Sequence, residues 1–147
     1  MKTPLNKGKA EALVFSRENN AEFLLKDAVE KLKEFMSDDQ NVYFAFIFGS
    51  YVRGKQKKIS DLDIAIYFKN PPEGVDLLYL INTLSDLTGK EIDLVTLNSA
   101  SAFLRHQIMK YGIPLIIKDR DVYMRFREKT ISDYDEYKFV SGIYVYD

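Results

Sequence analysis

The chain has 147 residues, of which 46% are hydrophobic and 29% charged, and its net charge is −1. These values are typical of one globular domain, and they exclude a general attraction to nucleic acid or to an anionic membrane. The absence of cysteine excludes disulfides and cysteine-ligated zinc, and it agrees with a reducing cytoplasm. No apolar run is long enough to span a bilayer, and we expect no signal peptide.

The first half of the chain contains a helix and two strands. Residues 1–20 are polar and aperiodic, and we interpret them as an N-terminal extension. Apolar residues at helical spacing predict an amphipathic helix at residues 21–36. Residues 42–48 are continuously apolar, as in a strand buried on both faces, and end at Gly49. A basic loop at residues 51–60, with room for a helical turn at its start, leads to a second strand at residues 62–68.

The second half alternates helices and strands. The predicted segments are a helix at residues 77–87 closed by Gly89, a strand at 92–97 and a helix that ends at Tyr111. Ser99 or Ser101 can cap that second helix. A short strand at 113–117, in which Pro114 suits a sheet edge, and a helix at 119–137 follow. This order predicts an α/β (α+β) fold with a single mixed sheet of three to four strands flanked by helices. The domain then covers residues 21–138. The tyrosine-rich tail at 139–147 could be a strand, a docking segment or loose.

Two aspartates stand at the head of the second strand. Asp61 and Asp63 are two residues apart, so their side chains point to the same face of the strand. Neighbouring carboxylates repel each other unless a cation lies between them, and carboxylate oxygens are ligands that Mg²⁺ prefers. The alternative is that both residues merely begin a strand, with Asp61 as a turn residue after Ser60.

A third acid strengthens the metal interpretation. Asp93 lies between Ile92 and Leu94 at the start of the next strand, and the alternation favours it over the neighbouring Glu91. Three carboxylates on neighbouring strands can hold two metal ions, and Asp93 could also act as a general base. The alternative is an exposed strand acid.

Phosphate contacts are predicted before the aspartates. Gly49 and Ser50 offer a close backbone approach, free amides and a hydroxyl, although an ordinary strand-ending turn has the same composition. The loop cations Arg53, Lys55, Lys57 and Lys58 could reach phosphates, or could simply be solvated.

These residues together resemble the nucleotidyltransferase superfamily of DNA polymerase β. Its signature is Gly-Ser, ten residues, Asp-x-Asp and a later strand carboxylate, and here it reads Gly49-Ser50, residues 51–60, Asp61-Leu62-Asp63 and Asp93. The short chain and the Gly-Ser-x-x-Arg-Gly form, through Arg53, are similar to the minimal nucleotidyltransferase (MNT) group. The resemblance covers about residues 22–138.

The resemblance implies the fold and the activity of that superfamily. Members bind ATP or another NTP with two Mg²⁺ ions, transfer the nucleoside monophosphate to a hydroxyl and release pyrophosphate. Asp61 and Asp63 would hold both ions, and Asp93 would hold one ion and help to deprotonate the acceptor. Gly49 and Ser50 would contact the β- and γ-phosphates. Proteins of the MNT group pair with a helical HEPN protein, act as antitoxins, and in some cases adenylylate a tyrosine of the toxin.

Three functional hypotheses follow. The first is a cytoplasmic Mg²⁺-dependent nucleotidyltransferase that moves AMP from ATP onto a hydroxyl of a partner protein, with no nucleic acid or membrane involved. The second is a non-catalytic antitoxin that binds its partner by contact alone. The third is a small-molecule nucleotidyltransferase, against which the lack of a second, pocket-forming domain argues. The acceptor, the choice of NTP and any homo-oligomer stay open.

Overall fold

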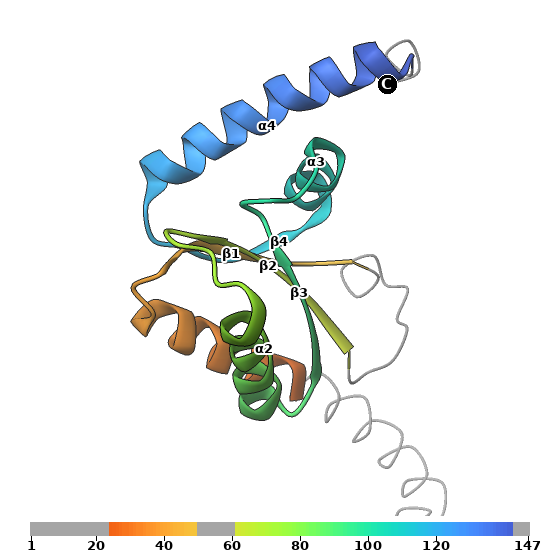
Figure 1. Cartoon of the computed structure of the whole chain (residues 1–147). Helices are drawn as coiled ribbons and strands as arrows, with labels where there is room; N and C mark the ends of the chain where they lie inside the picture. The colour runs from red at the N-terminus through yellow and green to blue at the C-terminus, as the bar shows by residue number, and fades with distance from the viewer. Residues whose placement is uncertain (1–23, 50–60, 143–147) are drawn as a thin grey trace, which may run out of the picture.

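The computed structural model of the chain describes residues 24–49 and 61–142 (Figure 1). The proposed extension at 1–20, the basic loop at 51–60 and the end of the tail at 143–147 lie outside these residues. A helix at residues 24–38 precedes the elements β1 Val42–Phe48, β2 Asp61–Phe68, α2 Gly74–Thr88, β3 Glu91–Thr96, α3 Ala102–Tyr111, β4 Ile113–Ile117 and α4 Arg120–Ser141. The order of strands in the sheet is β3-β2-β1-β4. Strands β1–β2 and β1–β4 pair antiparallel and β2–β3 parallel, so the predicted mixed α/β sheet is confirmed.

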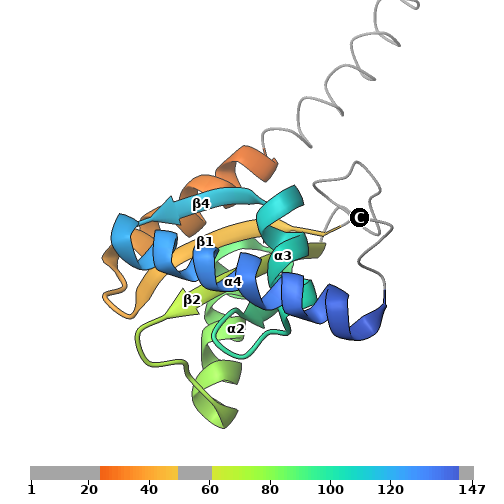
Figure 2. The same cartoon turned by 90° about the horizontal axis from the view of Figure 1, so that it is seen from above.

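Helices cover both faces of the sheet. The helix at residues 24–38 and α2 lie on one face, and α3 and α4 lie on the other (Figures 1 and 2). Two hydrophobic clusters fill the layers, one containing Leu32, Met36 and Leu84, the other Ile108 and Phe126. No helix in the described part of the chain is long and apolar enough to cross a membrane.

Strand β1 shows why a continuous apolar run belongs at the centre of the sheet. Ala45 and Ile47 pack into the first cluster, whereas Phe44 and Phe46 pack into the second, and all four are buried. The strand is therefore covered on both faces, as its composition predicts. Pro114 lies in β4, which among the described strands pairs with β1 alone, so the prediction of an edge position is confirmed.

Helix ends follow local capping chemistry. Ser101, rather than Ser99, caps α3, and its hydroxyl accepts a hydrogen bond from the Leu104 amide at 3.2 Å. Helix α4 continues to Ser141, past the predicted end at residue 137, because no helix breaker occurs before Gly142. That glycine has φ +72° and closes the helix through its amide, which donates to the Lys138 and Phe139 carbonyls.

Arg105 links α3 to α4 through hydrogen bonds. Its guanidinium donates to the Ala100 carbonyl at 3.1 Å, to the Thr130 hydroxyl at 3.3 Å and to the Asp133 carboxylate at 2.9 Å. The side chain is only 14% exposed, and Thr130 is fully buried. Removing one partner of such a network leaves the others desolvated without a hydrogen bond, so Arg105 is a structural residue and not a solvated helix arginine.

The tyrosines near the end of α4 lie in two different environments. Tyr134 is buried and stacks on His106 with ring centroids 3.8 Å apart, so this histidine serves helix packing. Tyr137 remains 38% exposed beside Phe103. Tyr144 and Tyr146, which the sequence also offers for docking, lie outside the described residues.

The Asp133 carboxyl gives this packing a pH dependence. Hydrogen bonds from Lys129 and from Arg105 hold the pKa of Asp133 below its usual value of 3.8. Because the folded-state pKa is lowered, this stabilisation is complete above the unfolded pKa and is lost as the pH falls through the folded pKa. We expect Asp133→Asn to lower the melting temperature at pH 7 and to flatten its decline below about pH 5, measured by thermal denaturation from pH 7 to pH 3.

Asp135→Asn is the matched control, because Asp135 is an exposed acid of the same helix whose pair with Lys138 spans 3.6 Å. The control should keep the parent's pH profile. An Asp133→Asn profile that runs parallel to the parent's would contradict the assignment.

Candidate active site

The register of the sheet brings the predicted acids together. In the parallel pair β2–β3, Asp63 lies opposite Asp93. Paired strands are about 4.8 Å apart, so the two carboxylates project from adjacent positions. Asp61 and Asp63 alternate with Leu62, which packs into the cluster on the α2 side. The acids therefore face the side of the sheet that α3 and α4 cover further along the strands.

Gly49 lies directly against one of these acids. It follows β1, whose last residue Phe48 pairs with Asp63. Its φ is +88°, a value that L side chains rarely adopt, and a Cβ atom built there would collide with the Asp63 carboxylate. The strand-ending glycine that the sequence predicts as a phosphate corner is thus held beside the carboxylate.

Asp61 carries an unsatisfied oxygen. Its Oδ1 atom is buried and has no hydrogen-bond partner among the described residues. Buried polar atoms are nearly always paired, and an exception calls for an explanation such as an ion. Hard carboxylate oxygens on neighbouring strands are the donor set that Mg²⁺ takes, so the residues present fit the metal.

The three carboxylates do not form a complete metal-binding group in the described residues. No group of three acidic or histidine side chains in residues 24–49 and 61–142 stands at metal-binding distance. Asp93 is exposed.

Glu91 is a second candidate for the acid that β3 contributes to the site. It has the same strand parity as Asp93 and lies opposite Asp61. Alternation therefore does not separate the two residues, and the preference for Asp93 on that ground was wrong. The register separates them, because Asp93 lies opposite Asp63 and thus next to Gly49, whereas Glu91 lies two pairs further out, opposite Asp61.

The rest of the predicted phosphate site lies outside the described residues. Ser50 and Arg53 fall there, as do the lysines of the basic loop. Their assignment as nucleotide-binding residues stays a prediction.

The family to which these residues point is shown by comparison with known proteins. The family model of the polymerase beta nucleotidyltransferases matches residues 30–121, more than half of the chain. The chain belongs to this family, which confirms the resemblance seen in the Gly-Ser and Asp-x-Asp spacing, and it is a nucleotidyltransferase-type enzyme.

Individual relatives agree in sequence and fold. The protein adenylyltransferase MntA of Shewanella oneidensis is 32% identical over 117 residues, which cover 80% of this chain and 76% of that protein. A candidate protein adenylyltransferase of Methanocaldococcus jannaschii is 41% identical over 75 residues, or 51% of this chain and 76% of that protein. The crystal structure of a toxin–antitoxin complex with AMP-PNP contains a similar chain, with a TM-score of 0.68, 27% identity, and coverage of 80% of this chain and 94% of that chain.

The contact between Gly49 and Asp63 can be tested by substitution. We expect Gly49→Ala to lose stability through its left-handed φ, about 1–2 kcal/mol, and roughly another 1–3 kcal/mol through the collision with Asp63. The free energy of unfolding in urea measures both losses together.

Gly89→Ala separates the two contributions. Gly89 has a comparable φ of +69°, but a Cβ there would meet nothing within 4 Å. This variant should therefore lose only the backbone contribution. Equal losses in the two variants would show that the Asp63 carboxylate does not constrain Gly49.

Proposed function

We propose that the protein is a Mg²⁺-dependent adenylyltransferase that transfers AMP from ATP to a hydroxyl group of a partner protein. The observation that carries the proposal is the register that sets Asp63 opposite Asp93, with Gly49 against the Asp63 carboxylate. It occurs in a chain of the nucleotidyltransferase family, and relatives named protein adenylyltransferases match it. The use of ATP favours a cytoplasmic location.

The proposed roles follow the positions of the residues. Asp61 and Asp63 would hold two Mg²⁺ ions, and Asp93 would hold one of them. When bound, the ions supply positive charge that stabilises the attacking and leaving oxygens of a phosphoryl-type displacement. Gly49 and Ser50 would contact the β- and γ-phosphates, with Arg53 as a further phosphate contact.

In the proposed reaction, one bond to the α-phosphorus of ATP forms while another breaks. The acceptor oxygen forms a bond to the α-phosphorus of ATP while the bond from that phosphorus to the bridging oxygen breaks. Pyrophosphate leaves, and the acceptor proton passes to Asp93 as general base and then to water. Asp93 is exposed, so both the acceptor hydroxyl and water can reach it.

A protein acceptor is favoured by the exposure of Asp93 and by the relatives of the chain. In the described residues, the acids lie at the beginnings of two strands, and Asp93 is exposed to solvent. A small acceptor needs an enclosing pocket, whereas a protein brings its own surface. The solved relative at 27% identity belongs to a toxin–antitoxin complex. We therefore propose a HEPN-type helical partner as the acceptor.

Removal of the carboxylates tests the enzymatic proposal. We expect Asp61→Asn combined with Asp63→Asn, and Asp93→Asn alone, to lower AMP transfer by about 10³-fold or more, because several kcal/mol of transition-state stabilisation is lost. The measurement is the transfer of label from α-³²P-ATP to the co-purified partner. Asp86→Asn, an exposed acid on α2 over the opposite face of the sheet, should leave the transfer unchanged.

The same assay separates the alternatives. A partner that binds and is neutralised without receiving label would identify a non-catalytic binding module. Label recovered on a small metabolite instead of the partner would identify a small-molecule transferase. Full transfer by the Asp61/Asp63 double variant would refute the site assignment.

A further inference from the structure

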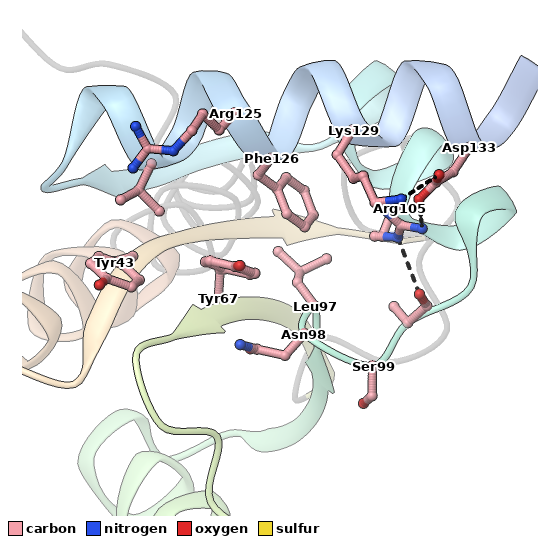
Figure 3. A pocket seen from close by; sticks show the side chains of 12 residues that line it. Tyr43, Tyr67, Leu97, Asn98, Ser99, Arg105, Arg125, Phe126, Lys129 and Asp133 are labelled. Carbon is pink, nitrogen blue, oxygen red and sulfur yellow. Dashed lines mark hydrogen bonds and ion pairs between the residues drawn. The ribbon is translucent and has the colours of Figure 1, made fainter.

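A pocket lies at the opposite end of the acid-bearing face of the sheet from the carboxylates. It is a pocket of about 570 Å³ near the ends of β2 and β3, roofed by α4 and bordered by the loop that follows β3 (Figure 3). Tyr67 lines it, and this residue lies four positions after Asp63 on the same strand. Four residues of strand span about 13 Å, so the pocket is remote from the carboxylates.

Packed core separates this pocket from the proposed active site. Ala65, which lies between Asp63 and Tyr67 on the same face of β2, is fully buried. Ile108 of α3 and Phe126 of α4 belong to the same buried cluster. Because these side chains close the sheet surface between its two ends, a ligand in the pocket cannot touch the carboxylates.

Aromatic rings form the floor of the pocket. The register of β1 against β2 shifts between Val42 and Phe44, and this irregularity allows Tyr43 to pack into the same cluster as Phe44. Tyr43 stacks against Tyr67 with ring centroids 6.0 Å apart and an interplanar angle of 29°. Figure 3 shows these two tyrosines below Phe126, which descends from α4. Tyr67 also stacks on Phe44, with ring centroids 5.0 Å apart, and contacts Phe126, with ring centroids 4.9 Å apart. A planar ligand would therefore contact the parts of the two half-exposed tyrosine rings that these neighbours leave accessible.

Positive charge surrounds the aromatic floor. Three cationic side chains line the pocket, Arg105, Arg125 and Lys129, against the single carboxylate of Asp133. Asp133 pairs with Arg105 and with Lys129, both at 2.9 Å. Arg125 has no ion pair or hydrogen bond among the described residues, so its planar guanidinium remains available to an anion.

We propose that this pocket is a second ligand site, which binds a small molecule carrying both a planar ring and a phosphate-type anion, of the class of nucleoside monophosphates. The ring would lie on Tyr43 and Tyr67, and the anion would meet Arg125. The volume falls within the range of about 300–1,000 Å³ usual for small-molecule sites. This site is independent of the carboxylates, so the proposal does not rest on the transferase activity.

The test measures AMP binding by calorimetry to the full-length Asp61→Asn/Asp63→Asn variant, in which the proposed metal site is removed. We expect saturable binding of AMP, tighter than that of adenosine or of inorganic phosphate, because each of these offers only half of the contacts. Adding Arg125→Ala should weaken AMP binding by about tenfold, the effect of losing one charge-assisted contact. Arg125 is exposed and forms no ion pair within residues 24–49 and 61–142, so we expect its removal to leave the fold intact.

Arg127→Ala is the matched control. Arg127 is an exposed arginine two positions further along α4, and it does not line the pocket. Unchanged AMP affinity in this variant supports the proposal. Three results would overturn it: no saturable AMP binding in the Asp61→Asn/Asp63→Asn background, equal weakening by Arg127→Ala, or inorganic phosphate binding as tightly as AMP.

Discussion

The parallel pairing of β2 with β3 is the constraint on which the site depends. It sets Asp63 opposite Asp93, while the antiparallel pairing of β2 with β1 brings Gly49 to the same place. The register itself is fixed by burial, because Leu62, Ile64 and Ile66 fill the cluster on the α2 side. A slip of one residue would turn these side chains to the other face and the aspartates into the core. The free energy of core packing thus holds the acids in position.

The two helices on the acid-bearing face are joined to each other and pack against its middle. Arg105 ties α3 to α4 through Thr130 and Asp133, and the pair of helices covers the middle of the face with Ile108 and Phe126. Carboxylates stand at one end of this face and cations at the other. A chain with a net charge of −1 therefore presents two local fields of opposite sign on one face of its sheet.

Local sequence pattern was sufficient for the elements and for much of the candidate site. Apolar runs and alternation depend on nearest neighbours, so the four strands and the common face of Asp61 and Asp63 followed from the sequence. The pairing of strands is a long-range property, and for this reason alternation could not rank Asp93 above Glu91. The irregularity beside Tyr43 escaped prediction for the same reason, since it exists only relative to the partner strand.

Arg105 illustrates a further limit of sequence pattern. A lone arginine on an amphipathic helix has the same local signature whether it is solvated or buried, and its partners Thr130 and Asp133 are 25 and 28 residues away. Only the crossing of α3 and α4 brings them together. The residues of the second pocket share this property, because β1, β2, the loop after β3 and α4 each contribute only part of the lining.

The contrast between the two ends of the face bears on how a domain of this size can act on another protein. At the acid end, the carboxylates begin their strands and Asp93 is exposed. At the cationic end, α4 and aromatic rings enclose a volume of about 570 Å³. A small molecule is held best where walls surround it, and a hydroxyl on a folded partner is best received where they do not. The pocket therefore lies away from the carboxylates, on the part of the face where α4 and the aromatic rings supply walls.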